Sequence, residues 1–443
     1  MRPLLSHLGP NGWFRDRLKA AHGGSTNTTH DRPRILLITS RFPYGKGEQF
    51  LEAELPHWVG KDAHLIVAPE KNDTPDVLPR PRLSGIERDD RLRRRWVNPL
   101  WRGLATIEAA ADPLVWHEII QLRRLGRLRP AQIKFVLRTG IQVALVRRFL
   151  RDFYRDVDLV YTYWLGPSAT AAALEHRAGT IRHAVSRCHS ADIYENHHPI
   201  GHHPFIRQVA NGFDEILPIS RDGKRFLSDR YDIDPQIVDT RCLGVSIPAK
   251  RQGCSPTGAQ TLTVMSVSTM IPVKRVDLLI DALAVFHRDH PELELTWIHA
   301  GDGILREELT RQAHERLSGV TVQLLGILPN VELLDFYLSH QIDLLVSTSS
   351  SEGIPVSMME AMAREVPVLG TDVGGVSEVV LPGWLMDSSS TAQQVADAIW
   401  EHAEQAKDPQ LRAEMARKVR TDFDGDVNFE RFINELVDLA HES

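Results

Sequence analysis

Short apolar runs that alternate with amphipathic segments restrict the fold of this sequence more than any other feature. After Pro33 the chain carries a first series of apolar runs at 35–39, 64–68, 159–164, 183–188 and 215–219. Helical patterns such as 168–176 lie between several of them. Strands that alternate with helices pair into parallel sheets with helical crossovers, so the pattern predicts an α/β protein.

A second series of the same kind begins after 248–258, a stretch of Pro, Gly and Ser that is typical of a linker. Its apolar runs are 262–267, 293–300, 320–325, 342–347 and 366–370, with helical patterns near 276–288, 304–316, 330–339, 355–364 and 392–406. Near-continuous apolar strands of this type are covered by helices on both faces. Two successive halves joined by a linker predict two domains with a cleft between them, and ligands at the carboxyl ends of the strands.

The predicted organisation has four parts. Residues 1–32 form a disordered lead-in, 33–247 an N-terminal domain with a helical insertion at about 81–155, 258–424 a C-terminal domain, and 425–443 a closing helix. A length of 443 residues agrees with two domains.

Composition excludes several classes of protein. The net charge of −6 gives no reason to expect nucleic acid as a partner, and the three cysteines have neither zinc-ligand spacing nor a disulfide framework. No apolar run approaches the ~20 residues of a membrane helix, and the start of the chain lacks the apolar centre of a secretory signal. We therefore expect a reducing, cytoplasmic setting.

The tract 81–155 is basic, with 17 Arg or Lys residues against 7 Asp or Glu. Trp96, Trp101 and Trp116 lie in the same tract. One interpretation is a solvated helical face whose tryptophans point into the core. The other is a surface that docks on anionic lipid, where each basic residue contributes ~1 kcal/mol.

The stretch from Ser347 to Ala363 is the most informative. An apolar strand ends in a serine-rich turn, Gly353 permits close backbone approach, and Pro355 suits the first position of a helix. The amides of Val356, Ser357 and Met358 would then point beyond the strand. Amides at a helix start form a site for an anion such as a diphosphate.

Glu352 and Glu360 stand on either side of this helix start. Eight residues of helix span ~12 Å, more than the ~5 to ~9.5 Å between the carboxyl groups of glycosidases. The two acids are better interpreted as separate anchors for hydroxyl groups. The alternative is that Glu352 caps the helix and Glu360 is solvated.

These residues resemble a known family. Glu-x7-Glu within 351–363, followed by 366–378, resembles the signature of family 4 retaining glycosyltransferases, nearest to the exopolysaccharide and colanic acid type. The resemblance extends over nearly the whole chain after residue 33 and implies the GT-B architecture, two Rossmann-like domains facing across a cleft. It implies that Glu360 holds the nucleotide ribose, and that Glu352, Gly353, Ile354 and Pro355 face the transferred sugar and phosphates.

The segment 273–283 resembles a second block of the family, in which a lysine at the position of Lys274 pairs with the donor diphosphate. A cation there stabilises charge that develops on the leaving group. The family's arginine five residues earlier is replaced here by Thr269, which retains a hydrogen-bond donor, and Arg275 is a candidate to supply the missing charge. Gly301 and Gly303 resemble the family's nucleotide-side loop, and Leu328 lies in a segment whose backbone would face the base.

The first half adds acceptor-side candidates. Residues 189–194 resemble the family's His-x-x-Asp-Ile-Tyr motif, which implies that His189 lies beside the reactive sugar carbon with Asp192 nearby. A lone strand-end histidine is otherwise usually structural. The loop 41–50 resembles the opening loop of the same subgroup, and Gly45 and Gly47 would let it approach a substrate.

No metal and no cofactor are expected. The histidine pairs 197–198 and 202–203 lack a carboxylate scaffold, and the run that starts at Asp422 has Ile433 where a calcium loop needs Glu. The resemblance implies metal-independent transfer of a sugar, with retention, from a nucleoside diphosphate sugar to a hydroxyl of a growing, lipid-linked surface glycan. The alternatives are a catalytically weak nucleotide-sugar-binding protein and a GT-B nucleotide-sugar epimerase. Peripheral association with the inner face of the membrane would suit the basic tract.

Overall fold

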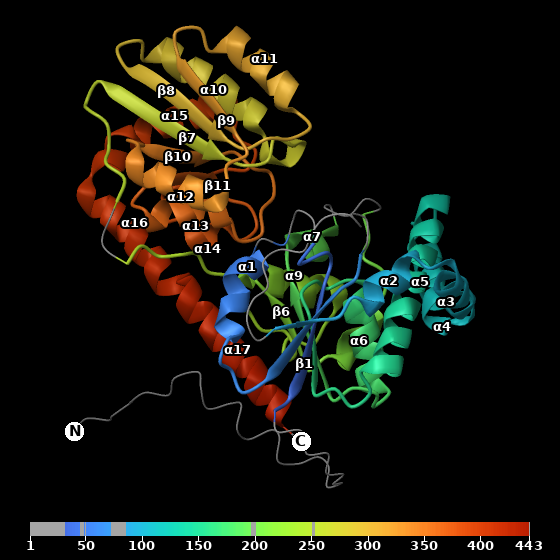
Figure 1. Cartoon of the computed structure of the whole chain (residues 1–443). Coiled ribbons are helices and arrows are strands. Elements are labelled where there is room, and N and C mark those ends of the chain that lie inside the picture. The colour runs from blue at the N-terminus through green and yellow to red at the C-terminus, as the bar shows by residue number, and fades with distance from the viewer. Residues whose placement is uncertain are drawn as a thin grey trace, which may run out of the picture. The chain divides into compact units, whose positions relative to one another are not determined.

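The computed structural model describes residues 32–44, 48, 50–71, 86–195, 201–249 and 253–442. The predicted lead-in therefore lies outside the described residues, apart from Arg32. Residues Pro33–Ser443 group into one compact unit. Within the described part of that unit, the strands form two six-stranded sheets (Figure 1).

The first sheet has the order β3-β2-β1-β4-β5-β6, and all its pairings are parallel. Its strands are β1 (Arg34–Thr39), β2 (His64–Pro69), β3 (Glu87–Arg88), β4 (Leu159–Thr162), β5 (His183–Cys188) and β6 (Glu215–Pro218). The helices of this half are α1 (Phe50–Glu54), α2 (Arg91–Val97), α3 (Pro99–Ala111), α4 (Pro113–Arg124), α5 (Pro130–Phe153), α6 (Pro167–Arg177), α7 (Ser190–Ile193), α8 (Ile206–Val209) and α9 (Arg221–Tyr231).

The second sheet has the order β12-β11-β10-β7-β8-β9 and is also parallel. Its strands are β7 (Thr261–Val267), β8 (Glu294–Ala300), β9 (Thr321–Gly326), β10 (Leu344–Ser347), β11 (Val368–Thr371) and β12 (Leu385–Met386). The helices that follow the linker are α10 (Val276–Asp289), α11 (Arg306–Arg316), α12 (Asn330–Ser339), α13 (Val356–Ala363), α14 (Val376–Val379), α15 (Ala392–Ala403), α16 (Pro409–Asp422) and α17 (Gly425–His441).

Both sheets have the Rossmann strand order, counted from their own first strand. In each, the chain builds outward in one direction and then returns to add strands on the other side of the first. The order therefore reverses between β1 and β4 in one sheet, and between β7 and β10 in the other. Such a switch point opens a crevice at the carboxyl ends of its strands, where ligands of α/β sheets bind.

The strand residues explain why both faces of each sheet are covered. In β1, Leu36 and Ile38 belong to one hydrophobic cluster, whereas Ile35 and Leu37 belong to another on the opposite face. All four side chains are buried because successive residues of a strand point to opposite faces. An apolar run without alternation therefore requires helices on both sides.

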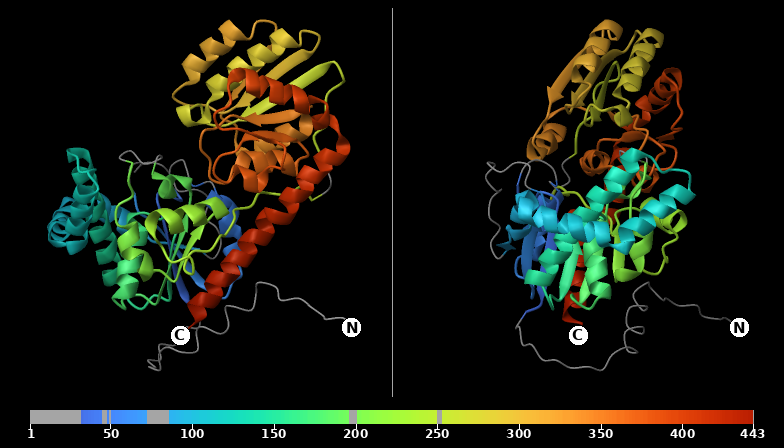
Figure 2. Two further views of the ribbon diagram at one scale, coloured as in Figure 1. Left: turned by 180° about the vertical axis from the view of Figure 1, so that it is seen from behind. Right: turned by 90° about the vertical axis from the view of Figure 1, so that its right-hand side faces the viewer.

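The basic tract includes β3 and the helices α2 to α5 that cross over from it to β4. Its long helix α5 packs with α6 on the first sheet, and α3 and α4 pack outside α5, away from the sheet (Figures 1 and 2). Gly140 permits this packing, because a Cβ added there would lie 2.7 Å from Cγ2 of Val115 in α4. The insertion also contains β3, whose two charged, exposed residues carry no apolar signal.

The last helix, α17, covers a face of the first sheet rather than the second. Phe432, Ile433, Leu436, Val437 and Ala440 share a cluster with residues of β1, β2 and β4. The chain thus returns to its first half after completing the second (Figure 1). This return makes the N-terminal core depend on the last residues of the sequence.

Candidate active site

The switch point of the second sheet holds an ion pair between two predicted site residues. Lys274 follows β7 and Glu352 follows β10, and Lys274 Nζ lies 2.6 Å from Glu352 Oε1. Ser349 Oγ donates a hydrogen bond of 2.7 Å to the same carboxylate oxygen. A cation and an acid from two adjoining strand ends therefore meet at the predicted donor site.

The start of α13 differs from the prediction by one residue. Pro355 is not the first helical residue but precedes the helix, with φ −79° and ψ 93°. The amide of Met358 already donates to the carbonyl of Pro355. Of the three amides predicted to face an anion, those of Val356 and Ser357 therefore precede the first hydrogen bond of the helix.

Glycines hold the loop before α13 against its neighbours. A Cβ added at Gly374 would lie 1.9 Å from the carbonyl oxygen of Glu352, and the amide of Gly375 donates to the carbonyl of Gly353. Gly374 also has φ +54°, which favours glycine. Backbone contacts thus fix the loop 352–354, and the side chain of Ile354, its last residue, is buried.

Glu360 lies two turns further along α13 and is buried. Its Oε1 accepts a hydrogen bond of 2.6 Å from Asn330 Nδ2 at the start of α12. Burial raises the pKa of Glu360, whereas the bond from Asn330 and the charge of Arg364 oppose the shift. A buried carboxylate oriented by an amide is suited to bind hydroxyl groups, which matches the predicted anchor better than a solvated side chain.

The carboxyl ends of β7 and β8 approach closely through two predicted glycines. A Cβ at Gly301 would lie 1.8 Å from the carbonyl oxygen of Ser268, and one at Gly303 would lie 2.4 Å from that of Met270. Thr269 is exposed between these contacts. The amide of Gly301 donates to Gly326 at the end of β9, two residues before Leu328. Four predicted donor residues therefore share one edge of the sheet.

Arg275 is directed elsewhere. Its guanidinium donates to the backbone carbonyls of Ser388 and Ser390, and its backbone is left-handed at φ 49°. In this structure it therefore braces the loop before α15 and does not replace the charge that Thr269 lacks. The donor-binding role predicted for Arg275 would require these bonds to break.

His189 ends β5 with its ring enclosed between aromatic side chains. The ring centroids of Tyr163 and Trp164 lie 4.8 and 4.6 Å from it, and neither ring nitrogen has a hydrogen-bond partner within the described chain. Burial and the charge of Arg187 lower its pKa to about 3. The imidazole is therefore neutral, and its predicted contact with the sugar would require the ring to turn out of this cage.

Asp192 is held by backbone amides. Its Oδ1 accepts from His189 N at 2.5 Å, and its Oδ2 accepts from Leu165 N at 2.6 Å. Burial raises its pKa to about 7 despite these two bonds. Asp192 thus ties the end of β5 to the loop after β4, at the switch point of the first sheet.

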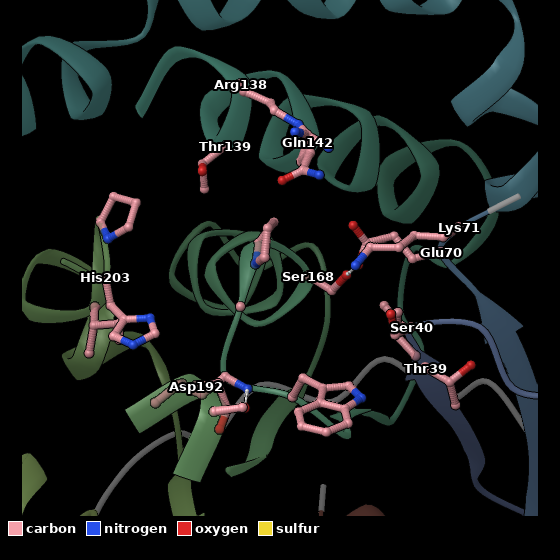
Figure 3. Close-up of a pocket in the computed structure, with 18 of the residues that line it drawn as sticks. Thr39, Ser40, Glu70, Lys71, Arg138, Thr139, Gln142, Ser168, Asp192 and His203 are labelled. Carbon is pink, nitrogen blue, oxygen red and sulfur yellow. Dashed lines mark hydrogen bonds between the residues drawn. The ribbon is translucent and has the colours of Figure 1, made fainter. Parts of the chain in front are cut away.

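A cavity of about 440 Å³ opens at that switch point (Figure 3). Figure 3 shows Asp192 on one side and Arg138, Thr139 and Gln142 of α5 on the other. Glu70, from the end of β2, also lines it. The cavity has the size of a small-ligand site, and His189 is not among its lining residues.

Two direct contacts join the predicted donor and acceptor sides. A Cβ added at Gly353 would lie 3.1 Å from Cβ of Ser190, which follows His189. Glu378 of α14 accepts hydrogen bonds of 3.0 Å from the amides of Arg221 and Asp222 at the start of α9. The donor loop of the second half therefore touches the strand end that carries the acceptor-side motif.

The remaining predicted residues either lie outside the described part of the chain or bond to side chains other than those predicted. Gly45 and Gly47 lie outside the described residues, as does the pair 197–198. His202 instead bonds Glu118 at 2.5 Å. Within the described chain, only His176, His183 and Asp214 lie close enough together to share an ion. They lie at the amino end of β5, the end opposite to His189, and Asp214 already accepts a hydrogen bond from Ala184 N.

Comparison with known proteins shows which family the second half of the chain resembles. Residues 256–422 match the family described as glycosyl transferases group 1. The matched stretch runs from just before β7 to the end of α16 and so contains the whole second sheet. The two described sheets have the GT-B fold, as in HepE of Anabaena in complex with UDP-glucose, which superposes with a TM-score of 0.58 at 16% identity over 91% of this chain and 99% of that one.

Two curated relatives align with about two thirds of this chain. TuaC of Bacillus subtilis, named a teichuronic acid biosynthesis glycosyltransferase, is 27% identical over 69% of this chain and 77% of its own. AmsK of Erwinia amylovora, an amylovoran biosynthesis glycosyltransferase, is 26% identical over 67% of this chain and 74% of its own. Both matches extend well beyond the C-terminal domain.

Sequence reasoning missed several residues of the site. Asn330 orients Glu360, Ser349 bonds Glu352, and Glu70 lines the first-sheet cavity. Glu70 follows the apolar run of β2 directly, so its position at a strand end was a usable signal. Asn330 carries no such signal in the sequence, because its partner Glu360 lies 30 residues away in another helix.

Proposed function

We propose that this glycosyltransferase moves a sugar from a nucleoside diphosphate sugar to a hydroxyl group of a growing glycan. The observation that carries the proposal is the pair of adjoining switch points. One presents Lys274 and the start of α13, and the other opens the cavity beside Asp192. The contact between Gly353 and Ser190 joins the loop proposed to bind the donor to the strand end next to the cavity proposed to bind the acceptor.

Each donor contact has a chemical role in this proposal. Lys274 and the amides of Val356 and Ser357 bind the diphosphate, where negative charge grows as the glycosidic bond breaks. Glu360 binds the ribose hydroxyls. Glu352 accepts from Lys274 and Ser349 and thereby orients the cation toward the leaving group.

We further propose that transfer retains the anomeric configuration and uses no metal. Glu352, the first residue of the donor loop 352–354, already accepts hydrogen bonds from the Lys274 ammonium and the Ser349 hydroxyl, so it is poorly placed as a nucleophile. The acceptor hydroxyl then attacks from the face that the phosphate leaves, and the leaving phosphate takes its proton. Proton NMR of the first product formed gives the anomeric configuration, and inversion would contradict this proposal.

The acceptor that we propose is a surface glycan on a lipid carrier, reached at the membrane. None of the described helices combines the length and apolarity needed to span a bilayer. However, α3 exposes Leu100, Leu104 and Ile107 along one face, at 76%, 43% and 70%. Trp116 of α4 is 50% exposed as well.

We call Leu100, Leu104, Ile107 and Trp116, together with the exposed arginines of α2 and α4, the docking face. Those arginines are Arg91, Arg94, Arg123 and Arg124. Exposed apolar side chains on helices next to others that carry exposed arginines suit an anionic lipid surface, where the apolar groups enter the headgroup region while the cations bind phosphate. The first interpretation of the basic tract holds in part, since Trp96 and Trp101 pack against the small cluster around Ala105.

The function is tested in two steps. A thermal-shift screen over UDP-, GDP- and ADP-sugars should find one donor class that stabilises the protein, by about 2.7 kcal/mol at 100 times its Kd. The same donor, radiolabelled, should then transfer its sugar to a lipid extract. Donor binding without transfer would favour a binding protein, and interconversion of the sugar without an acceptor would favour an epimerase.

A further inference from the structure

The cavity at the switch point of the first sheet contains more charge than a neutral glycan end requires. Two cations line it, Arg138 from α5 and Lys71 from the turn after β2. Within the described residues the Arg138 side chain has no hydrogen-bond or ion-pair partner. Burial raises the pKa of Glu70, and the charge of nearby Lys71 opposes that shift, so Lys71 is shared between this acid and the cavity. Figure 3 shows both cations among the side chains arranged around the cavity.

The contrast with the other arginines of the same helix is informative. Arg147 and Arg151 of α5 both bind the buried Glu175, and Arg148 binds Glu108. Arg138 lies on the same helix without an acid, at the wall of a cavity. Arg138 is exposed, and an exposed arginine at the wall of a cavity can turn its fork of donors to a phosphate or a carboxylate.

The remaining walls are suited to hydroxyl groups and a sugar ring. Glu70 is 6% exposed, its Oε2 accepts from Ser168 at 2.7 Å, and its Oε1 has no hydrogen-bond partner in the described chain. Gln142 lies one turn from Arg138 on α5. Trp164 is fixed by its Nε1, which donates to Glu48 at 2.7 Å, so its ring offers a rigid apolar wall.

The acids of the cavity restrict where an anion can bind. Glu70 and Asp192 both line it, and Figure 3 shows Asp192 across the cavity from α5. An anionic group is therefore expected near α5 and Lys71, with the neutral, hydroxyl-bearing part of the ligand toward Asp192. This arrangement also directs the hydroxyl end of the ligand toward the loop that contacts Gly353.

We propose that this cavity binds an acceptor carrying an anionic group, a phosphate or a carboxylate, through Arg138 and Lys71, while Glu70 and Gln142 bind hydroxyl groups of the adjoining sugar. The proposal rests on the proposed function and adds the chemical class of the acceptor. The anion has two sources, the diphosphate of a lipid carrier or an acidic sugar of the glycan. Both present anionic oxygens to the same two side chains, although a diphosphate carries more negative charge than a carboxylate.

The test is calorimetric titration of the full chain with three soluble probes, namely hexyl diphosphate, hexyl glucuronide and hexyl glucoside. At least one anionic probe should bind at least tenfold more tightly than the glucoside. The identity of the tighter probe then shows whether the anionic group comes from a lipid diphosphate or from an acidic sugar. Arg138→Gln and Lys71→Gln should each weaken that binding about tenfold, the range of a charge-assisted hydrogen bond. Lys134→Gln, an exposed lysine one turn away on α5, is the matched control and should change nothing.

Three results would overturn the proposal. The first is that neither anionic probe binds better than the glucoside. The second is equal binding by wild type, Arg138→Gln and Lys71→Gln. The third is binding that Lys274→Gln abolishes and Arg138→Gln does not, which would place the anion in the donor site. A failure of the proposed function would look different, because the wild-type protein would then bind no nucleoside diphosphate sugar in the thermal-shift screen.

Discussion

At the residue scale, the proposed transfer reaction depends on single charges placed at strand ends. Lys274 is the one described cation that contacts Glu352, because Arg275 is engaged with Ser388 and Ser390 and Thr269 is uncharged. A donor diphosphate would therefore rely on one lysine and on backbone amides. This makes the reaction unusually sensitive to that side chain.

Lys274→Ala should lower kcat by about 100-fold or more, the effect of removing one preorganised partner of developing charge. Steady-state transfer with the donor found in the screen measures it, and the melting temperature should stay close to that of wild type. Lys418→Ala, whose lysine pairs with Asp422 on α16, is the matched control. A kcat within twofold of wild type in Lys274→Ala would contradict the assigned role.

Asp192 gives a pH dependence whose direction follows from its environment. Burial raises its pKa from 3.8 to about 7, so between these values the folded chain binds more protons at this group than the unfolded chain. Its contribution to stability is therefore lost as pH rises through that window, by up to about 1.4 kcal/mol per pH unit. Urea unfolding of wild type and Asp192→Ala at pH 5, 6 and 7 should show the wild type losing stability relative to the variant. A constant difference would contradict the shift.

At the element scale, the sequence predicted the repeated strand–helix alternation because apolar runs and helical periods are local signals. All ten predicted strands correspond to strands of the two sheets. The two that were missed, β3 and β12, have two residues each and sit at the sheet edges, where little apolar surface is buried.

The site was predictable only where it was local in sequence. The turn around Glu352 and Gly353 carries its chemistry within a few residues, so its role in donor binding was a direct expectation. The cavity is different, because it joins the ends of β1, β2 and β4 to a helix of the insertion. Likewise, nothing local shows that Arg275 turns toward Ser388, which lies 113 residues away.

The apolar part of the docking face follows one side of α3. Leu100→Glu combined with Leu104→Glu should reduce co-sedimentation with vesicles that contain anionic lipid at least fivefold, since both side chains are already exposed and the fold does not need them. Val427→Glu, at another exposed apolar position, is the control. Binding that is unaffected by the double variant, or by salt and anionic lipid content, would exclude this surface.

At the scale of the whole molecule, catalysis requires the two halves to present donor and acceptor to one another. Glu378 accepts from two amides at the start of α9 and so ties the end of the donor motif to the first half. This contact is linked to the one between Gly353 and Ser190 through two backbone hydrogen bonds. The amide of Glu378 donates to the carbonyl of Gly375, and the amide of Gly375 donates to the carbonyl of Gly353. We infer that it keeps the donor sugar aligned with the acceptor cavity and shielded from water.

Glu378→Ala should therefore raise the ratio of donor hydrolysis to transfer several-fold, because water reaches the activated sugar more often when the halves separate. Product analysis with radiolabelled donor measures both reactions in one sample. Glu401→Ala, an exposed glutamate of α15, is the control. An unchanged ratio, with both rates as in wild type, would show that the contact has no part in alignment.

An activated sugar is proposed to bind at the switch point of the second sheet, held by Lys274 and Glu360. The decisive measurement is calorimetric titration of the donor into wild type, Lys274→Gln, Glu360→Gln and the control Glu401→Gln. Lys274→Gln and Glu360→Gln should each raise the donor Kd about tenfold or more, whereas Glu401→Gln should match wild type. Equal donor affinity in all four proteins would mean that the donor binds elsewhere.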